Sequence, residues 1–203
     1  MRYIYPPRPR GKIHPSDLAF YEKSGRWIAQ RKFGGSRTMA LLGSDGQVTF
    51  LNRHGFTQSS IKPNARIAES ISALGLKRGK EHLLDGEMMR GEESFMVLYD
   101  ILVLDGVYLF GKPNQLGRLE ILSQICGVGC RSMFGSEVGS NLYLADWWGS
   151  DFEQRFCESK GADNIEGLLL RKSESFLDNF GAAEYETPSQ IRCRKPLDSH
   201  YNF

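Results

Sequence analysis

The sequence predicts an α+β domain in which antiparallel β-sheets are flanked by helices, and three observations lead to this expectation. First, runs of β-branched, aromatic and aliphatic residues are joined by Asp-Gly turns at 45–46 and 105–106, which is a strong hairpin signal. Second, the helical periods are few and irregularly placed among the strands. Third, most strands are linked by hairpins or short loops, which argues against a doubly wound parallel sheet.

The first half of the chain predicts an extended Pro-rich arm at 1–15 and a short helix at 17–22. A strand at 27–30 then runs into a turn at 32–35, and the strands 38–42 and 48–52 form a hairpin. Residues 64–74 predict a helix. Its apolar residues Ile67, Ile71 and Leu74 recur at helical spacing, and Asn64 can cap its first turn.

The second half predicts two long strands at 83–88 and 95–104, and a short strand at 107–110 after the second Asp-Gly turn. Two helices follow at 116–125 and 151–158, and the closing strands are 165–171 and 190–195. Ser150 is placed to cap the second of these helices. The Gly/Ser-rich stretch 127–141 is expected to form a mobile surface loop.

Size and composition favour one globular domain spanning 1–203, since the chain has 203 residues, 25% of them charged and 40% apolar. No apolar run approaches the roughly 20 residues that span a bilayer, and the N-terminus lacks a secretory signal. The close pair Cys126 and Cys130 has no second pair at zinc-ligand spacing, so we expect reduced, structural thiols. We expect a monomer in the cytoplasm, of the cell or of a virus's host, with no membrane partner.

The net charge of +2 says little about partners, but its distribution says more. The arm carries Arg2, Arg8 and Arg10 with no acid nearby, and 190–195 is also purely basic. Basic clusters of this kind contact nucleic-acid phosphates or simply form a solvated face. We expect the three arm arginines to contact nucleic acid.

The segment KFGGSR at 32–37 places Lys32 at the end of an apolar strand, before two glycines and an arginine. Glycine lets the backbone approach a phosphate closely. A nucleophilic lysine must lose a proton, and with an ordinary pKa near ~10.4 it needs positive charge around it. Taken alone, the segment is more typical of a structural turn than of a nucleophile.

Later segments carry further polar residues within apolar strands. Glu87 follows an Asp-Gly turn, and Tyr99 precedes an acid inside an apolar run. Glu166 and Arg171 lie five positions apart on one predicted strand, where alternate residues share a face, so a bulge or twist is needed to bring both to one ligand. Each feature alone has an ordinary structural explanation, but the ordered set is hard to explain in that way.

In order, these segments are KFGGSR, NRHG, DGE, YD, EGLLLR and QIRCRKP, at 32–37, 52–55, 85–87, 99–100, 166–171 and 190–196. They resemble the K-x-D-G-x-R, S/N-R-x-G, D-G-E, aromatic-Asp, E-G-x-x-x-K and closing K-x-K motifs of the covalent nucleotidyltransferase superfamily, which comprises ATP-dependent DNA ligases, RNA ligases and mRNA capping enzymes. The resemblance covers nearly the whole chain and looks closest to phage or viral DNA ligases. It implies a ligase-type adenylation domain that uses ATP and Mg²⁺ on nicked DNA in replication or repair.

The resemblance also implies roles for individual residues. Lys32 would attack the α-phosphorus of ATP and release pyrophosphate. Arg37 and Glu87 would hold the ribose hydroxyls, Tyr99 would stack on adenine, and Gln30 would help to read the adenine edge. Arg53, in the NRHG segment, is also counted among the residues that bind the nucleotide.

At the other end of the site, Glu166 would help to place Mg²⁺, and Arg171 would neutralise the α-phosphate. Basic residues of the closing strand would also neutralise the α-phosphate, and the strand offers two alternatives for them. Arg192 and Arg194 share one face and form an R-x-R version of the motif, whereas Lys195 is followed by proline as in the family's K-P ending.

Two departures and one further expectation accompany the resemblance. Gly34 stands where the family usually has Asp or Asn, and Arg171 replaces the usual lysine, keeping the charge but not the geometry. Because the chain ends seven residues after Pro196, we expect no C-terminal OB-fold domain in it and hence slow reaction with ATP compared with sealing of a pre-adenylated nick.

The alternatives to a DNA ligase are an RNA ligase, a GTP-using capping enzyme and a non-catalytic nucleic-acid-binding remnant.

Overall fold

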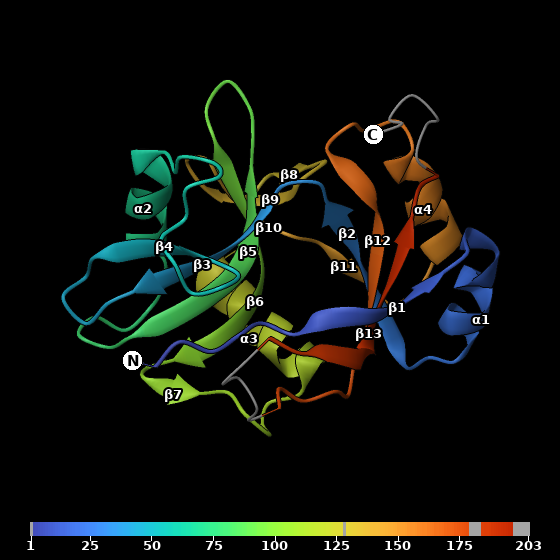
Figure 1. Ribbon diagram of the computed structural model, residues 1–203, viewed down its shortest axis with the longest axis horizontal. Coiled ribbons are helices and arrows are strands. Elements are labelled where there is room, and N and C mark those ends of the chain that lie inside the picture. Colours follow the sequence, from blue (N-terminus) through green and yellow to red (C-terminus); the bar gives the residue numbers. More distant parts are fainter. Residues whose placement is uncertain (1, 128, 179–183, 197–203) are drawn as a thin grey trace.

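The computed structural model describes residues 2–127, 129–178 and 184–196, which fold into two β-sheets with helices packed on both (Figure 1). The first sheet has the strand order β1-β13-β12-β2-β11, with bounds Arg8–Ile13, Glu186–Arg194, Ile165–Lys172, Trp27–Phe33 and Trp147–Trp148. The second has the order β4-β3-β5-β6-β10-β9-β8, with bounds Val48–Asn52, Ser36–Leu42, His82–Met89, Phe95–Leu104, Leu142–Leu144, Gly135–Gly139 and Arg131–Ser132. A short strand, β7 (Val107–Tyr108), pairs with β6.

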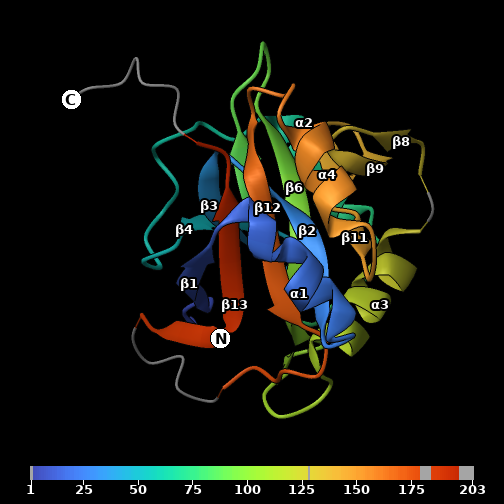
Figure 2. The same ribbon diagram turned by 90° about the vertical axis from the view of Figure 1, so that its right-hand side faces the viewer.

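The helices divide between the two sheets. Helices α1 (Leu18–Lys23), preceded by a 3-10 turn at Pro15–Asp17, and α4 (Phe152–Ser159) cover the five-stranded sheet, as Figure 2 shows. Their Leu18, Phe152 and Phe156 are buried against strands β2 and β12. Helices α2 (Ala65–Ser72) and α3 (Gln115–Cys126) pack on the eight-stranded sheet and enclose its larger apolar core.

The sequence predicted the α+β class and the antiparallel pairing of most strands correctly. The hairpin β3–β4 forms where it was predicted, and β5 pairs antiparallel with both β3 and β6. Two pairings are parallel, β1 with β13 and β10 with β6. Both join strands that are far apart in the sequence, so neither leaves a hairpin signal.

The arm is extended, as predicted, and its Arg8–Ile13 also pairs with β13 as the edge strand β1. Two other segments differ from the prediction. The stretch 127–141, expected to be a loop, contains β8 and β9, although residue 128 lies outside the described part. The strand before Lys32 continues through that residue to Phe33 instead of turning.

Helix capping agrees with the sequence at one end and differs at another. Asn64 accepts a hydrogen bond from the backbone N–H of Arg66 at 3.1 Å, as predicted. Ser150 does not cap α4; the N-cap is Asp151, in a left-handed conformation, and Glu22 of α1 accepts from the Phe152 N–H at 2.8 Å. The cap comes from another helix, so local sequence could not reveal it.

None of the helices in the described residues has the length and apolarity that a membrane crossing requires. The four cysteines are free thiols in the structure; Cys193 is buried, whereas Cys130 and Cys157 are exposed.

Candidate active site

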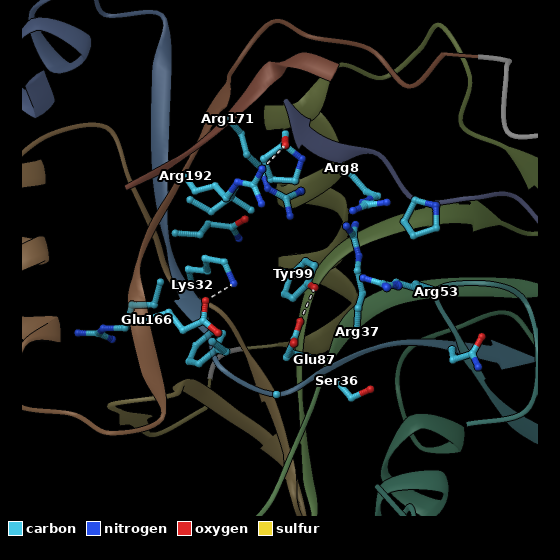
Figure 3. Close-up of a pocket in the computed structure, with 18 of the residues that line it drawn as sticks. Arg8, Lys32, Ser36, Arg37, Arg53, Glu87, Tyr99, Glu166, Arg171 and Arg192 are labelled. Atoms are coloured by element: carbon cyan, nitrogen blue, oxygen red, sulfur yellow. Dashed lines mark hydrogen bonds and ion pairs between the residues drawn. The ribbon is translucent and has the colours of Figure 1, made fainter. Parts of the chain in front are cut away.

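A cavity of about 490 Å³ lies between the two sheets and collects most of the residues singled out in the sequence (Figure 3). The predicted residues that line it are Arg8, Gln30, Lys32, Arg37, Arg53, Glu87, Tyr99, Glu166, Arg171, Arg192 and Arg194. The described lining holds eight lysines and arginines against three glutamates. Such an excess of positive charge in a cavity favours an anionic ligand.

Lys32 and Glu166 face each other on one wall of the cavity (Figure 3). The Lys32 Nζ is 2.7 Å from Glu166 Oε2, and the Arg194 Nε is 3.1 Å from the same oxygen. The β2–β12 register shifts between Ile165 and Gly167, and Gly167 has φ 137°. This is the bulge that the alternation of strand faces required if Glu166 and Arg171 were to share one cavity.

The two glycines after Lys32 differ in their surroundings. A Cβ at Gly35 would lie 2.4 Å from the backbone oxygen of Met88, so the close passage of β3 past β5 demands glycine there. A Cβ at Gly34 would meet Glu166, 3.3 Å from Cγ and 3.5 Å from Oε1. Glu166 therefore borders the space that a side chain at Gly34 would enter.

Arg37 is fixed in the wall opposite Lys32. Its Nε donates to Oδ1 of the buried Asp85 at 3.0 Å, and its Nη2 donates to the second carboxylate oxygen. Its Nη1 donates to the backbone oxygen of Pro7 at 2.8 Å, which ties the arm to the site. Asp85, quoted in the sequence as part of DGE without a role of its own, is thus the partner that orients Arg37.

Glu87 and Tyr99 form a hydrogen-bonded pair between the two walls (Figure 3). The Tyr99 hydroxyl donates to Glu87 Oε2 at 3.0 Å. Burial raises the pKa of Glu87 to about 7, outweighing the hydrogen bond from Tyr99 and the charge of Lys32, which act in the opposite direction. Burial likewise raises the pKa of Tyr99 well above its ordinary value.

Arg171 lies at the base of the cavity and is held from behind by a buried network. Its guanidinium is 5.2 Å from the Tyr99 ring centroid, and its Nη1 donates to Asp100 Oδ2 at 3.0 Å. Arg118 and Gln115, both on α3, also donate to the Asp100 carboxylate. Burial alone would raise the pKa of Asp100, but the two arginines hold it below its usual range.

Unpaired polar atoms point to a ligand. Gln30 is 1% exposed, yet among the described residues neither atom of its side-chain amide has a hydrogen-bond partner. The Nε and Nη2 groups of Arg171 are also buried and have no hydrogen-bond partner among the described residues. Buried polar atoms are normally satisfied, so these groups are ready for the donors and acceptors of a bound molecule.

Three predicted residues lie elsewhere in the described part of the chain. Arg2 and Arg10 are exposed and do not line the cavity. The Lys195 Nζ donates to the backbone oxygens of Ser159 and Ala162, at 3.1 and 2.8 Å, near the end of α4. Of the two versions of the closing motif, the one that reaches the cavity is Arg192 with Arg194.

Three charged or titratable lining residues, Arg31, His54 and Glu184, had no role predicted from the sequence. Arg31 stacks over Trp148 at 5.0 Å and lies 3.5 Å from Glu158. His54 stood in the quoted NRHG segment, which was the available signal. Glu184 had none, because its place depends on the pairing of β1 with β13.

Across residues 2–127, 129–178 and 184–196, no three His, Cys, Asp or Glu side chains gather as a ready-made metal cluster. Mg²⁺ is commonly held by one or two carboxylates together with substrate phosphates, so a single well-placed acid is sufficient. Glu166 fits this requirement because glycine at position 34 leaves space beside its Oε1.

The fold is that of the nucleotidyltransferase domain of ATP-dependent DNA ligases. A mycobacterial DNA ligase D complexed with ATP and MES superposes with a TM-score of 0.64 at 19% identity, covering 94% of this chain and 60% of that one. The ligase domain of M. tuberculosis LigD gives 0.65 at 18%, with the same coverage. The bacteriophage T7 ATP-dependent DNA ligase in complex with ATP gives 0.55 at 13%, covering 91% and 67%.

This chain therefore spans about 60% of the length of the two mycobacterial structures. No protein-family model and no curated protein sequence matches the chain.

Proposed function

We propose that this domain is the adenylate-transferring part of an ATP-dependent polynucleotide ligase and that Lys32 carries the AMP. The observation behind the proposal is that all six sequence segments, far apart in the chain, contribute residues to one basic cavity. The similarity in fold to DNA ligases supports the same class of chemistry.

In the first step, the unprotonated Lys32 Nζ attacks the α-phosphorus of ATP. A P–N bond forms while the P–O bond to pyrophosphate breaks, and pyrophosphate leaves. In the second step, an oxygen of a nucleic-acid 5′-phosphate attacks the same phosphorus and Lys32 leaves. In the third, a 3′-hydroxyl loses its proton and attacks the 5′-phosphorus. The new phosphodiester bond forms, the P–O bond to AMP breaks, and AMP leaves.

Phosphoryl-type transfer depends mainly on positioning and on charge neutralisation. Arg194 lies beside Glu166 on the Lys32 wall, and we assign to it and to Arg192 the neutralisation of the α-phosphate. Mg²⁺, when bound, supplies further neutralisation of phosphate charge, and Glu166 is the residue that would hold it.

The rest of the cavity suits a nucleoside. The unpaired Gln30 amide can donate to and accept from an adenine edge, a pairing that amide side chains make well. Tyr99 offers an aromatic surface for base stacking, a contact typically worth roughly 1–3 kcal/mol. Glu87 and Arg37, the residues assigned to the ribose, both adjoin Tyr99: Glu87 accepts from its hydroxyl, and Arg37 lies 5.7 Å from its ring centroid.

A nicked DNA duplex is the substrate we propose, with nicked RNA as the alternative. One observation favours a different function. With Gly34 in place of the usual acid, the domain lacks an orienting side chain beside Lys32, as expected of a remnant that binds nucleic acid without reacting.

Labelling with ATP or GTP carrying a radioactive α-phosphate tests the class of reaction. The proposal predicts a covalent label from ATP and Mg²⁺ that is absent in Lys32→Ala, followed by sealing of nicked DNA. A label from GTP would instead assign a capping enzyme, and sealing of RNA alone an RNA ligase. No label from either nucleotide would favour the remnant.

A further inference from the structure

The wall of the cavity that faces Lys32 holds an anion-binding arrangement that the steps above do not use (Figure 3). The Arg8 Nη1 donates to Glu184 Oε2 at 2.8 Å, and the His54 Nδ1 contacts the other carboxylate oxygen. The Arg53 Nε donates to the His54 Nε2 at 3.0 Å. With Nε2 accepting, Nδ1 carries a proton and donates to Glu184.

The backbone holds both donors in place. Arg8 belongs to β1, pairs with Glu186 of β13, and donates its N–H to the Tyr185 oxygen at 3.1 Å. The turn that carries His54 is closed by the Asn52 side-chain oxygen, which accepts from the His54 N–H at 2.9 Å. The backbone positions of Arg8 and His54 are therefore set by the scaffold rather than by the carboxylate between their side chains.

Gly55 and the arm secure the same turn. Gly55 has φ 83°, and a Cβ there would lie 3.0 Å from the Tyr3 ring. The Tyr3 hydroxyl donates to the Asn52 backbone oxygen at 3.0 Å. The arm and the turn consequently form one continuous wall.

Glu184 is the replaceable member of this cluster. Its side chain is 31% exposed and that of Arg8 is 40% exposed, and ion pairs as open as this contribute little to stability. A phosphate offers three acceptor oxygens and up to two charges where a carboxylate offers two oxygens and one, and arginine binds it with matching geometry. A phosphate entering the cavity can therefore displace the carboxylate.

We propose that Arg8 and His54 form a phosphate subsite that Glu184 occupies in the free protein and that a substrate phosphate takes over on binding. The inference rests on the proposed function, because it assumes a phosphate-bearing substrate in this cavity. Two phosphates have the required chemistry, the terminal phosphates of ATP and the 5′-phosphate at a nick.

Equilibrium binding without divalent metal tests the subsite with two ligand pairs. ATP is compared with AMP, and a 5′-phosphorylated nicked duplex with its 5′-hydroxyl counterpart. The variants are Glu184→Gln and Arg8→Gln, with Glu186→Gln and Arg10→Gln as controls. The control residues are exposed, lie on strands β13 and β1, and make the same charge changes outside the cavity.

Glu184→Gln is expected to tighten binding of the phosphate-bearing member of one pair about tenfold, and Arg8→Gln to weaken it about tenfold, as for one charge-assisted hydrogen bond. The controls should change both members of each pair by the same factor. The pair that responds identifies the phosphate. Thermal unfolding of each variant confirms that the mutated side chains, which are all partly or fully exposed, have not altered the fold.

The subsite would be overturned if Glu184→Gln changed the affinities for both ligand pairs as its control Glu186→Gln does. The same holds if Arg8→Gln acted like its control Arg10→Gln. A wild-type protein that prefers the phosphate-bearing member in neither pair would overturn it as well. Because binding is read without a covalent step, a protein that fails to label at Lys32 yet shows the expected selectivity refutes the proposed function alone. Labelling at Lys32 without that selectivity refutes the subsite alone.

Discussion

Replacing Asp100 with asparagine is expected to lower the free energy of unfolding by about 3–5 kcal/mol, because it leaves two buried guanidinium groups without their counter-charge. Arg118 donates to the carboxylate from Nε at 2.9 Å and Arg171 from Nη1 at 3.0 Å, and each of the three side chains is 1% exposed. Asparagine keeps the shape and one acceptor but removes the charge. The expected loss is a large part of the roughly 5–15 kcal/mol typical of a folded domain.

Urea unfolding monitored by circular dichroism measures this loss. With a denaturant slope of about 2–3 kcal/mol/M, the midpoint should fall by about 1–2.5 M. Asp105→Asn is the matched control: its side chain is 43% exposed, and its φ of 54° is one that asparagine also adopts. We expect that control to stay within about 0.5 kcal/mol of the wild type.

The pH dependence gives a second reading of the same pair. The arginines hold the pKa of Asp100 below its ordinary value, so its stabilising charge is present above the unfolded-state pKa and is lost only as the pH falls through the lower folded-state value. The gap between the wild type and Asp100→Asn should therefore be the same at pH 7 and pH 5. A loss under about 1 kcal/mol at pH 7 would refute the idea that Asp100 compensates both arginines.

Three further predictions concern other parts of the site. Burial raises the pKa of Glu87 from 4.5 to about 7, so the wild type should lose stability relative to Glu87→Gln as the pH rises from 4.5 to 7. Below that range the difference in unfolding free energy between the two proteins should not change with pH. Melting temperatures that vary with pH in parallel for both proteins would contradict this. Gly35→Ala should destabilise the domain by about 1–3 kcal/mol or more because its Cβ would meet a backbone oxygen, whereas Gly34→Ala should cost under about 1 kcal/mol; chemical unfolding compares the two, and equal losses would count against the steric contrast between these sites. Affinity for a nicked duplex should fall steeply between low and moderate salt, and neutralising Arg2 and Arg10 together should make the log–log slope shallower; an unchanged slope in a filter-binding titration would remove the arm from the interface.

Much of the fold could be predicted from the sequence because its signals are local. The Asp-Gly turns, the apolar strand runs and the Asn64 cap all depend on neighbouring residues, and the structure follows them. The pairing of β1 with β13 and the cap that Glu22 supplies to α4 depend on residues more than 100 positions away, so no local pattern could reveal them.

The site shows the same division. Eleven of the fourteen residues predicted for the site line one cavity. Glu166 and Arg171 are among them, but both can face the cavity only because of a β-bulge, which the sequence showed to be necessary without showing that it exists. The buried partners were missed. Arg118 is a charged residue on a largely apolar helix, which could have signalled a buried counter-charge, but its partner Asp100 is defined only by the packing of α3 on β6.

The most direct test of the central claim is to locate the AMP. The protein is incubated with ATP and Mg²⁺, digested, and mapped by mass spectrometry beside Lys32→Ala and the control Lys195→Ala, whose amine points to the backbone near the end of α4. We expect one AMP on Lys32 in the wild type and in Lys195→Ala, and none in Lys32→Ala. An adduct that persists in Lys32→Ala, or that maps to another lysine, would contradict the assignment of Lys32 as the nucleophile.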